Sequence, residues 1–165
     1  MNTAYAEAAG EPRLSRETKI GLGTVGAVVA IRIVGGNFIA NDWEGWDTFV
    51  PTAIGAAVEG LVLWGLMFGL VVRLSGRSRG DRPGVVGAII GVLAVCSLAI
   101  PYSAPQAILG AAAVALGLIA VDRAERPASL RLGSVAVATG LFVIAAWLFF
   151  VAFTFVTGSW PNVVP

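Results

Sequence analysis

Five apolar stretches separated by short polar segments dominate this sequence. A helix of about 20 residues crosses the roughly 30 Å hydrocarbon core of a bilayer. Apolar residues make up 57% of the chain and charged residues only 13%, so there are too few polar side chains to cover a water-facing surface. The pattern predicts an all-α integral membrane bundle with five transmembrane helices. The five segments are Ile20–Ala40, Phe49–Val72, Val85–Ile100, Ala104–Val121 and Leu132–Thr157.

The polar ends of the chain divide it into three parts. Residues 1–19 carry charges of both signs and predict a short N-terminal tail. Residues 20–157 hold the predicted transmembrane domain, and residues 158–165 form a second tail. A signal peptide is the alternative for the first apolar stretch. That stretch is long and no small-residue cleavage motif follows it, so we favour a retained first span.

Basic residues alternate between successive loops. They occur in the N-terminal tail and in the segments after the second and fourth stretches, but not after the first, third or fifth. Of the 11 basic residues, all except Arg32 therefore fall on one side of the membrane. Because cytoplasmic loops are enriched in Lys and Arg, the N-terminus is predicted to lie in the cytoplasm and the C-terminus outside.

The third and fourth stretches are near the lower length limit for a span. They meet at a turn, residues 101–105, that contains two prolines. A re-entrant hairpin would leave the outer charged segments on the same side, so the charge pattern does not exclude it. Each arm is nevertheless too long for a half-helix, and we favour two complete spans.

Two ionisable residues, Arg32 and Glu59, lie well inside predicted spans. Each is costly there, by about 2.5–3.5 kcal/mol on insertion scales. Counted from the outer ends of their spans, Arg32 lies about 12 Å deep and Glu59 about 15 Å. Similar depth and opposite sign predict an ion pair between the first two helices. The pair either fixes helix packing or forms a substrate, ion or proton site. The alternative is that Gly35-Gly36-Asn37, which follows Arg32 closely, ends or kinks the first helix early. Arg32 would then lie nearer the outer interface, where its long side chain could reach the polar region.

Four arginines follow the second stretch: Arg73, Arg77, Arg79 and Arg82. They suffice as determinants of membrane orientation. The alternative is that they bind anionic lipid headgroups or a cytoplasmic partner.

Small residues recur four positions apart in the apolar stretches, a spacing that lets membrane helices approach closely. We expect these pairs to serve bundle packing, with a dedicated oligomer interface as the alternative. The small-residue pairs are Gly26 and Ala30, Ala56 and Gly60, Gly65 and Gly69, Gly87 and Gly91, Ala113 and Gly117, and Ala136 and Gly140.

Cys96, the one cysteine, is expected to be a small packing residue in the middle of its span.

Several chemistries find no support in the sequence. Histidine is absent, which removes the commonest metal ligand and general base, and no phosphate-loop or dinucleotide motif is present. We therefore predict no catalytic residue, metal or cofactor. A net charge of +1 argues against nucleic acid. The expected partners are the lipid bilayer, further copies of the chain or another membrane protein.

Two functions agree with these observations. The first is a small non-enzymatic accessory or regulatory membrane subunit, and the second is an oligomeric transporter or channel subunit that uses Arg32 and Glu59. A membrane-embedded enzyme ranks third. A dry, fully paired bridge would favour the first, and a polar, water-accessible cavity the second. The abundance of Arg, Ala, Gly and Val is typical of GC-rich bacterial genomes, so we expect a multi-pass protein of a bacterial cell membrane.

Overall fold

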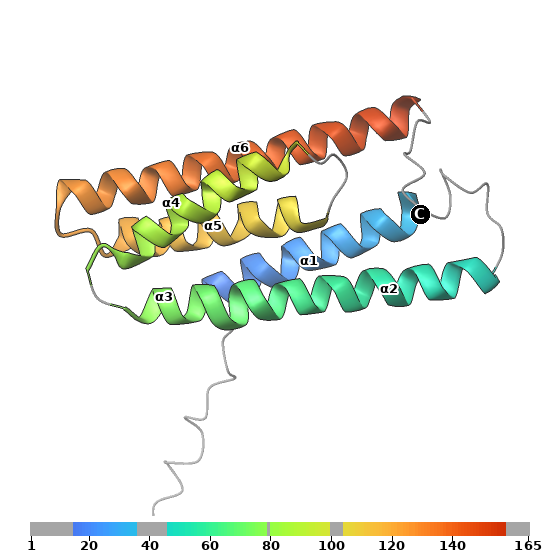
Figure 1. The fold of residues 1–165 in the computed structure, drawn as a ribbon, viewed down its shortest axis with the longest axis horizontal. Helices are drawn as coiled ribbons and strands as arrows, with labels where there is room; N and C mark the ends of the chain where they lie inside the picture. Colours follow the sequence, from blue (N-terminus) through green and yellow to red (C-terminus); the bar gives the residue numbers. More distant parts are fainter. Residues whose placement is uncertain (1–14, 36–45, 79, 100–103, 158–165) are drawn as a thin grey trace, which may run out of the picture.

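The structure, a computed structural model, describes residues 15–35, 46–78, 80–99 and 104–157. All regular structure within these ranges is helical, which confirms the all-α class (Figure 1). Helices α2, η3 and α3 follow one another without a break and form one long helix with a π-helical middle. The elements are α1 (Arg16–Val34), α2 (Trp46–Trp64), η3 (Gly65–Val72), α3 (Arg73–Arg77), α4 (Arg82–Ser97), α5 (Ala104–Asp122) and α6 (Pro127–Thr157).

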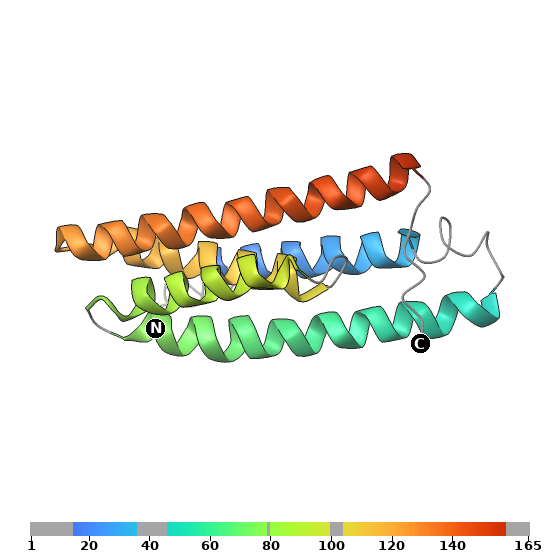
Figure 2. The ribbon, with the colours of Figure 1, turned by 45° about the horizontal axis from the view of Figure 1, so that its top comes forward.

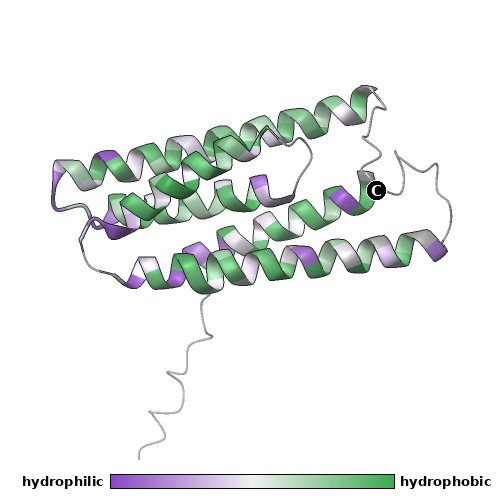
Figure 3. Cartoon of the chain, viewed as in Figure 1, coloured by the Kyte–Doolittle hydropathy of each residue, from purple (hydrophilic) through white to green (hydrophobic). Residues whose placement is uncertain are grey.

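Three helical segments in the described ranges are long and apolar enough to cross a membrane: Phe49–Arg77, Pro105–Asp122 and Pro127–Thr157. Helix α4 is apolar but has only 16 residues. Figure 3 shows that hydrophobic residues cover most of α4, α5 and α6, whereas α1 is mixed and α2 carries a hydrophilic turn away from its ends. The chain is thus built as a membrane-embedded helical protein.

Helix α1 begins inside the stretch assigned above to the N-terminal tail. Ser15 caps it, because the Ser15 hydroxyl accepts a hydrogen bond of 3.2 Å from the backbone N–H of Thr18. Glu17 in the first turn favours the positive end of the helix dipole. Residues 16–19 are therefore helical, because local capping extends the helix beyond its apolar part.

Helices α4, α5 and α6 pack tightly together, and we call them the three-helix core. Helix α5 lies at the centre of this core. In an apolar stretch of 18 residues, 72% of α5 is buried inside the protein, against 28% for α6. Its alanines supply much of the buried surface, including Ala111, Ala112 and Ala115. A helix surrounded by other helices needs small side chains so that its neighbours can come close.

Glycines set the distance between α5 and α6, which run antiparallel. A Cβ added to Gly117 would lie 2.7 Å from the carbonyl oxygen of Gly133, and one added to Gly140 would lie 2.5 Å from that of Gly110. Real side chains do not fit at such distances, so the two backbones touch at both points. A Cβ added to Gly87 of α4 would likewise lie 3.0 Å from the Cβ atoms of Ala136 and Leu116.

Four of the six small-residue pairs take part in helix packing as expected. Ala56 and Gly60, Gly87 and Gly91, Ala113 and Gly117, and Ala136 and Gly140 are all buried. The other two pairs are not used in this way. Gly26 and Ala30 are exposed, and nothing lies within 4 Å of a Cβ added to Gly65 or Gly69.

Helices α1, α2, η3 and α3 form a second unit, which we call the arm. Within it, Val25 and Val29 of α1 pack over Gly60 of α2. Val28 of α1 joins a buried cluster with Trp147 of α6. Helix α1 therefore links α2 to the three-helix core (Figures 1 and 2). The long helix that contains α2 is itself mostly uncovered, because only 17% of its apolar 18-residue stretch is buried.

The start of α1, the helix α3 and the end of α5, which carry basic residues, lie toward one end of the bundle, on the left in Figure 1. Arg16 at the start of α1 lies 3.8 Å from Asp122 at the end of α5. Nη1 of Arg123 donates a hydrogen bond to the carbonyl oxygen of Gly76 in α3. Ser129 of α6 donates to Asp81 before α4, at 2.5 Å. We call this the basic end.

Cys96 does not occupy the packing position that we predicted. It is exposed and is the second-last residue of α4 rather than a mid-helix residue. The prediction was wrong because Cys96 lies on the exposed face of α4, with Val92 four positions before it, and because α4 ends at Ser97, before the apolar stretch of the sequence ends.

Candidate functional site

Arg32 and Glu59 meet across the contact between α1 and α2. Nη1 of Arg32 donates to Oε2 of Glu59. Val29, one turn before Arg32, packs on Gly60, whose missing side chain lets the helices approach. The neighbouring Gly60 therefore explains how the two charged side chains come within reach.

The described part of helix α1 ends close to this pair. Val34 is its last residue and Gly35 is its C-cap, so Arg32 stands in the last turn. A cation there is favoured by the negative end of the helix dipole. Gly36 and Asn37 lie outside the described residues. The depth of about 12 Å assumes a helix that continues to Ala40, and it stays a prediction because residues 36–40 also lie outside the described residues.

Glu59 is better placed as an intramembrane residue. It lies ten positions after Phe49, where the span-length segment Phe49–Arg77 begins, or about 15 Å along the helix. The side chains of Arg32 and Glu59 are 40% and 41% exposed. The two charges pair with each other. Because both side chains are partly exposed, the pair lies at the surface of the arm and not inside the bundle. Its role in packing or transport stays a prediction.

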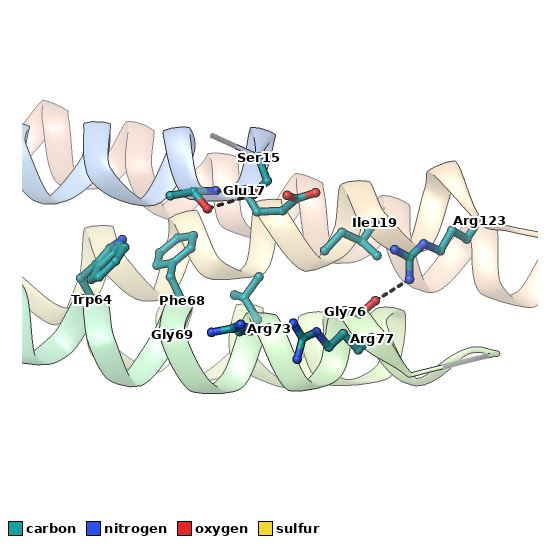
Figure 4. A pocket seen from close by; sticks show the side chains of 12 residues that line it. Ser15, Glu17, Trp64, Phe68, Gly69, Arg73, Gly76, Arg77, Ile119 and Arg123 are labelled. Carbon is teal, nitrogen blue, oxygen red and sulfur yellow. Dashed lines mark hydrogen bonds between the residues drawn. The ribbon is translucent and has the colours of Figure 1, made fainter. Parts of the chain in front are cut away.

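A pocket of about 420 Å³ opens at the basic end, between α1, the η3–α3 part of the arm and α5. We call it the basic pocket. Figure 4 shows Trp64 and Phe68 toward one end of it and Arg77 and Arg123 toward the other. Its polar lining is Ser15, Glu17, Thr18, Arg73, Arg77 and Arg123, and the rest is Trp64, Phe68, Gly69, Val72, Gly76 and Ile119.

The four arginines after the second stretch have different places. Arg73 and Arg77 line the basic pocket. Arg82 begins α4 and is not among the lining residues, and Arg79 lies outside the described residues. Arg123, one of the basic residues that follow the fourth stretch and were expected only to set orientation, completes the basic cluster. It directly follows α5, and α5 packs beside η3 and α3, which brings Arg123 to Gly76.

A second hollow between the loops of the basic end has a different character. Three arginines line it, Arg77, Arg123 and Arg126, together with three acids, Asp81, Asp122 and Glu125. Opposite charges therefore balance in this hollow, whereas the basic pocket has three arginines and one acid, Glu17.

Gln106 is a buried polar residue that sequence reasoning missed. Its side chain is 1% exposed, and Nε2 donates to the carbonyl oxygen of Ser97 at 2.7 Å. The last carbonyls of a helix lack partners within that helix, so Gln106 satisfies one at the end of α4 and joins α4 to α5. A lone amide early in an apolar stretch, directly after Pro105, was the available signal.

The described residues contain no group of three or more His, Cys, Asp or Glu side chains placed to hold a metal ion. No family model, curated protein or solved structure matches the chain. Its function must therefore be inferred from the exposed ion pair and the basic pocket.

Proposed function

We propose that this chain is a small, non-enzymatic accessory or regulatory subunit of a bacterial cell membrane, which binds another membrane protein through its arm. In this proposal the chain crosses the membrane five times, with its N-terminus in the cytoplasm and its C-terminus outside. Three helices of spanning length and the gathering of basic residues at one end of the bundle support this topology.

The exposure of the ion pair carries the proposal. Charged atoms that face hydrocarbon are costly, and pairing cancels the net charge but leaves polar surface at the edge of the arm. Arg32 and Glu59 are both about 40% exposed. A partner helix that covers the pair and offers a hydrogen-bonding side chain would remove this cost. An accessory subunit gains stability in this way only when bound.

The surface around Glu59 is suited to a helix. Val58, directly before Glu59, and Val62, three positions after it, are each 55% exposed on α2. Residues three positions apart share a helix face, so Val62 and Glu59 present an apolar and a polar contact to the same neighbour. We expect the partner to be a transmembrane helix with a polar side chain at the same depth.

The same exposure favours one alternative, an oligomeric transporter or channel subunit. Several copies of the arm placed around one axis would gather their Arg32–Glu59 pairs into a shared polar site. Intramembrane charges commonly mark ion or proton pathways. In this case the partner is a second copy of the chain.

Site-specific photo-crosslinking distinguishes these functions. A photoreactive residue at position 62 of α2 is compared with one at Phe142, which is 59% exposed on α6. We expect one discrete membrane protein to be captured from position 62 and not from 142, and the tagged partner to retrieve this chain in return. The double variant Arg32→Gln, Glu59→Gln should lose the adduct.

Two other outcomes would count against the accessory role. Adducts of only twice the chain's own mass would shift the assignment to the oligomeric transporter. Equal capture at positions 62 and 142, or none at either, would reject the arm as a binding surface.

A further inference from the structure

We propose that the basic pocket binds one anionic phospholipid, with the phosphate held by Arg73 and Arg77 and the first part of an acyl chain lying on Phe68 and Trp64. This inference is independent of the accessory role, because it concerns the opposite part of the arm from the ion pair.

Charge is the first argument. Three arginines and one glutamate line the pocket, so its lining is net positive. Arg73 and Arg77 are one helical turn apart and point from the same helix, and neither forms an ion pair within the described residues. Guanidinium groups match phosphate oxygens in bidentate geometry. Arg123 closes this end by its hydrogen bond to Gly76.

The second argument is the change in polarity along the pocket. Arg77 and Arg123 lie toward one end, and Trp64 and Phe68 toward the other (Figure 4). Phe68 is one of the buried core residues, and it provides a hydrophobic wall. A phospholipid has the same order of charged headgroup and apolar chain, whereas a free phosphate ion has no use for the apolar end. Basic pockets between membrane helices are known to hold anionic headgroups.

The helix that forms the wall is unusual. Residues 65–72 are π-helical, and π-helical segments occur frequently at functional sites. Gly69 in this segment lines the pocket, and nothing lies within 4 Å of a Cβ built there. A Cβ at this position therefore has open space around it, and we expect a larger side chain there to reduce the room in the pocket.

Lipid binding to the purified full-length chain in mild detergent tests the proposal. Native mass spectrometry is used to measure retention of phosphatidylglycerol, phosphatidylcholine and soluble glycerol phosphate. We expect retention of one phosphatidylglycerol molecule and release of phosphatidylcholine. The Arg73→Gln, Arg77→Gln double variant should bind roughly 30-fold more weakly, from the attraction of each arginine for an anionic lipid surface.

The matched control removes the same charge elsewhere. Arg82→Gln with Arg126→Gln changes two arginines that do not line the basic pocket, and it should reduce affinity less than about threefold. Gly69→Leu keeps every charge and should abolish retention by filling the pocket. If the glutamine variant does not fold, Arg73→Lys with Arg77→Lys keeps the charge but loses bidentate geometry, and partial retention is expected.

Three results would overturn the proposal. Equal retention of phosphatidylcholine would show that no anion is recognised. An equal loss in the Arg82, Arg126 control would show nonspecific attraction to net charge. Full displacement by glycerol phosphate with unchanged binding in Gly69→Leu would identify a soluble phosphate site in place of a lipid site.

Discussion

At the scale of single residues, the Arg32–Glu59 pair differs from a buried salt bridge. Burial would make the loss of one partner very costly, because the other charge would stay unpaired, whereas exposure in water would make the pair weak. This pair is about 40% exposed on a helix that is built to face lipid. Lipid screens charge poorly, so either partner left alone is costly, while both together are tolerated.

Removing one partner should therefore destabilise the protein more than removing both. We expect Arg32→Gln and Glu59→Gln each to lower the free energy of unfolding by about 1–3 kcal/mol, with most of the loss recovered in the double variant. Thermal unfolding of the purified protein measures this. Arg131→Gln, an exposed arginine on α6, is the control and should have little effect. Strictly additive losses would mean that the pair contributes no coupling.

At the scale of helices, matched glycines decide how α5 and α6 pack. Gly110 and Gly117 on α5 face Gly140 and Gly133 on α6. On each helix the two glycines are seven residues apart, or about two helical turns. The contacts therefore repeat on one face of each of the two antiparallel helices. Close backbone approach replaces the hydrophobic drive that is missing between helices in lipid.

Adding one methyl group at this contact should be costly. In Gly117→Ala the new Cβ would lie 2.7 Å from the carbonyl oxygen of Gly133, and backbone cannot move aside as a flexible side chain can. We expect a loss of about 1–3 kcal/mol, as for other overpacked sites. Gly26→Ala is the control, because nothing lies within 4 Å of its added Cβ and alanine favours helix by up to about 1 kcal/mol. Equal melting temperatures for both variants would contradict the glycine contact.

At the scale of the whole molecule, the ends of the helices divide the protein by charge. Arg16, Arg123 and the α3–α4 connection meet at the basic end, although they are far apart in sequence. The opposite end of the arm begins with Asp47 in the first turn of α2. Loop charges set membrane orientation, so these two ends should face opposite sides of the membrane.

Cysteine labelling in intact cells tests this orientation. Asp47→Cys should react with an impermeant reagent, and Ala124→Cys at the basic end should not. Both variants need a Cys96→Ala background, because the native cysteine is exposed. Permeabilised cells provide the control, in which position 124 should react as well. Reaction of position 124 in intact cells would reverse the proposed orientation.

The sequence alone determined the features that depend on local composition. Apolar length predicted helices, because a backbone in lipid must satisfy its hydrogen bonds internally. The pairing of Arg32 with Glu59 was also accessible, since consecutive spans are usually neighbours. Their exposure was not, because it depends on where the three-helix core lies relative to the arm.

Tertiary structure alone decided which helix lies at the centre of the core and which distant residues meet at the basic end. Hydropathy gives no preference for α5 as the central one, because other helices are also apolar enough to cross a membrane. That choice follows from how well small residues such as Gly110 and Gly140 fit across an interface. The same packing brings Arg123 to Gly76, beside Arg73 and Arg77 in a single pocket. These residues are far apart in the chain, and hydropathy is a property of each segment separately, so only the packed bundle brings them together.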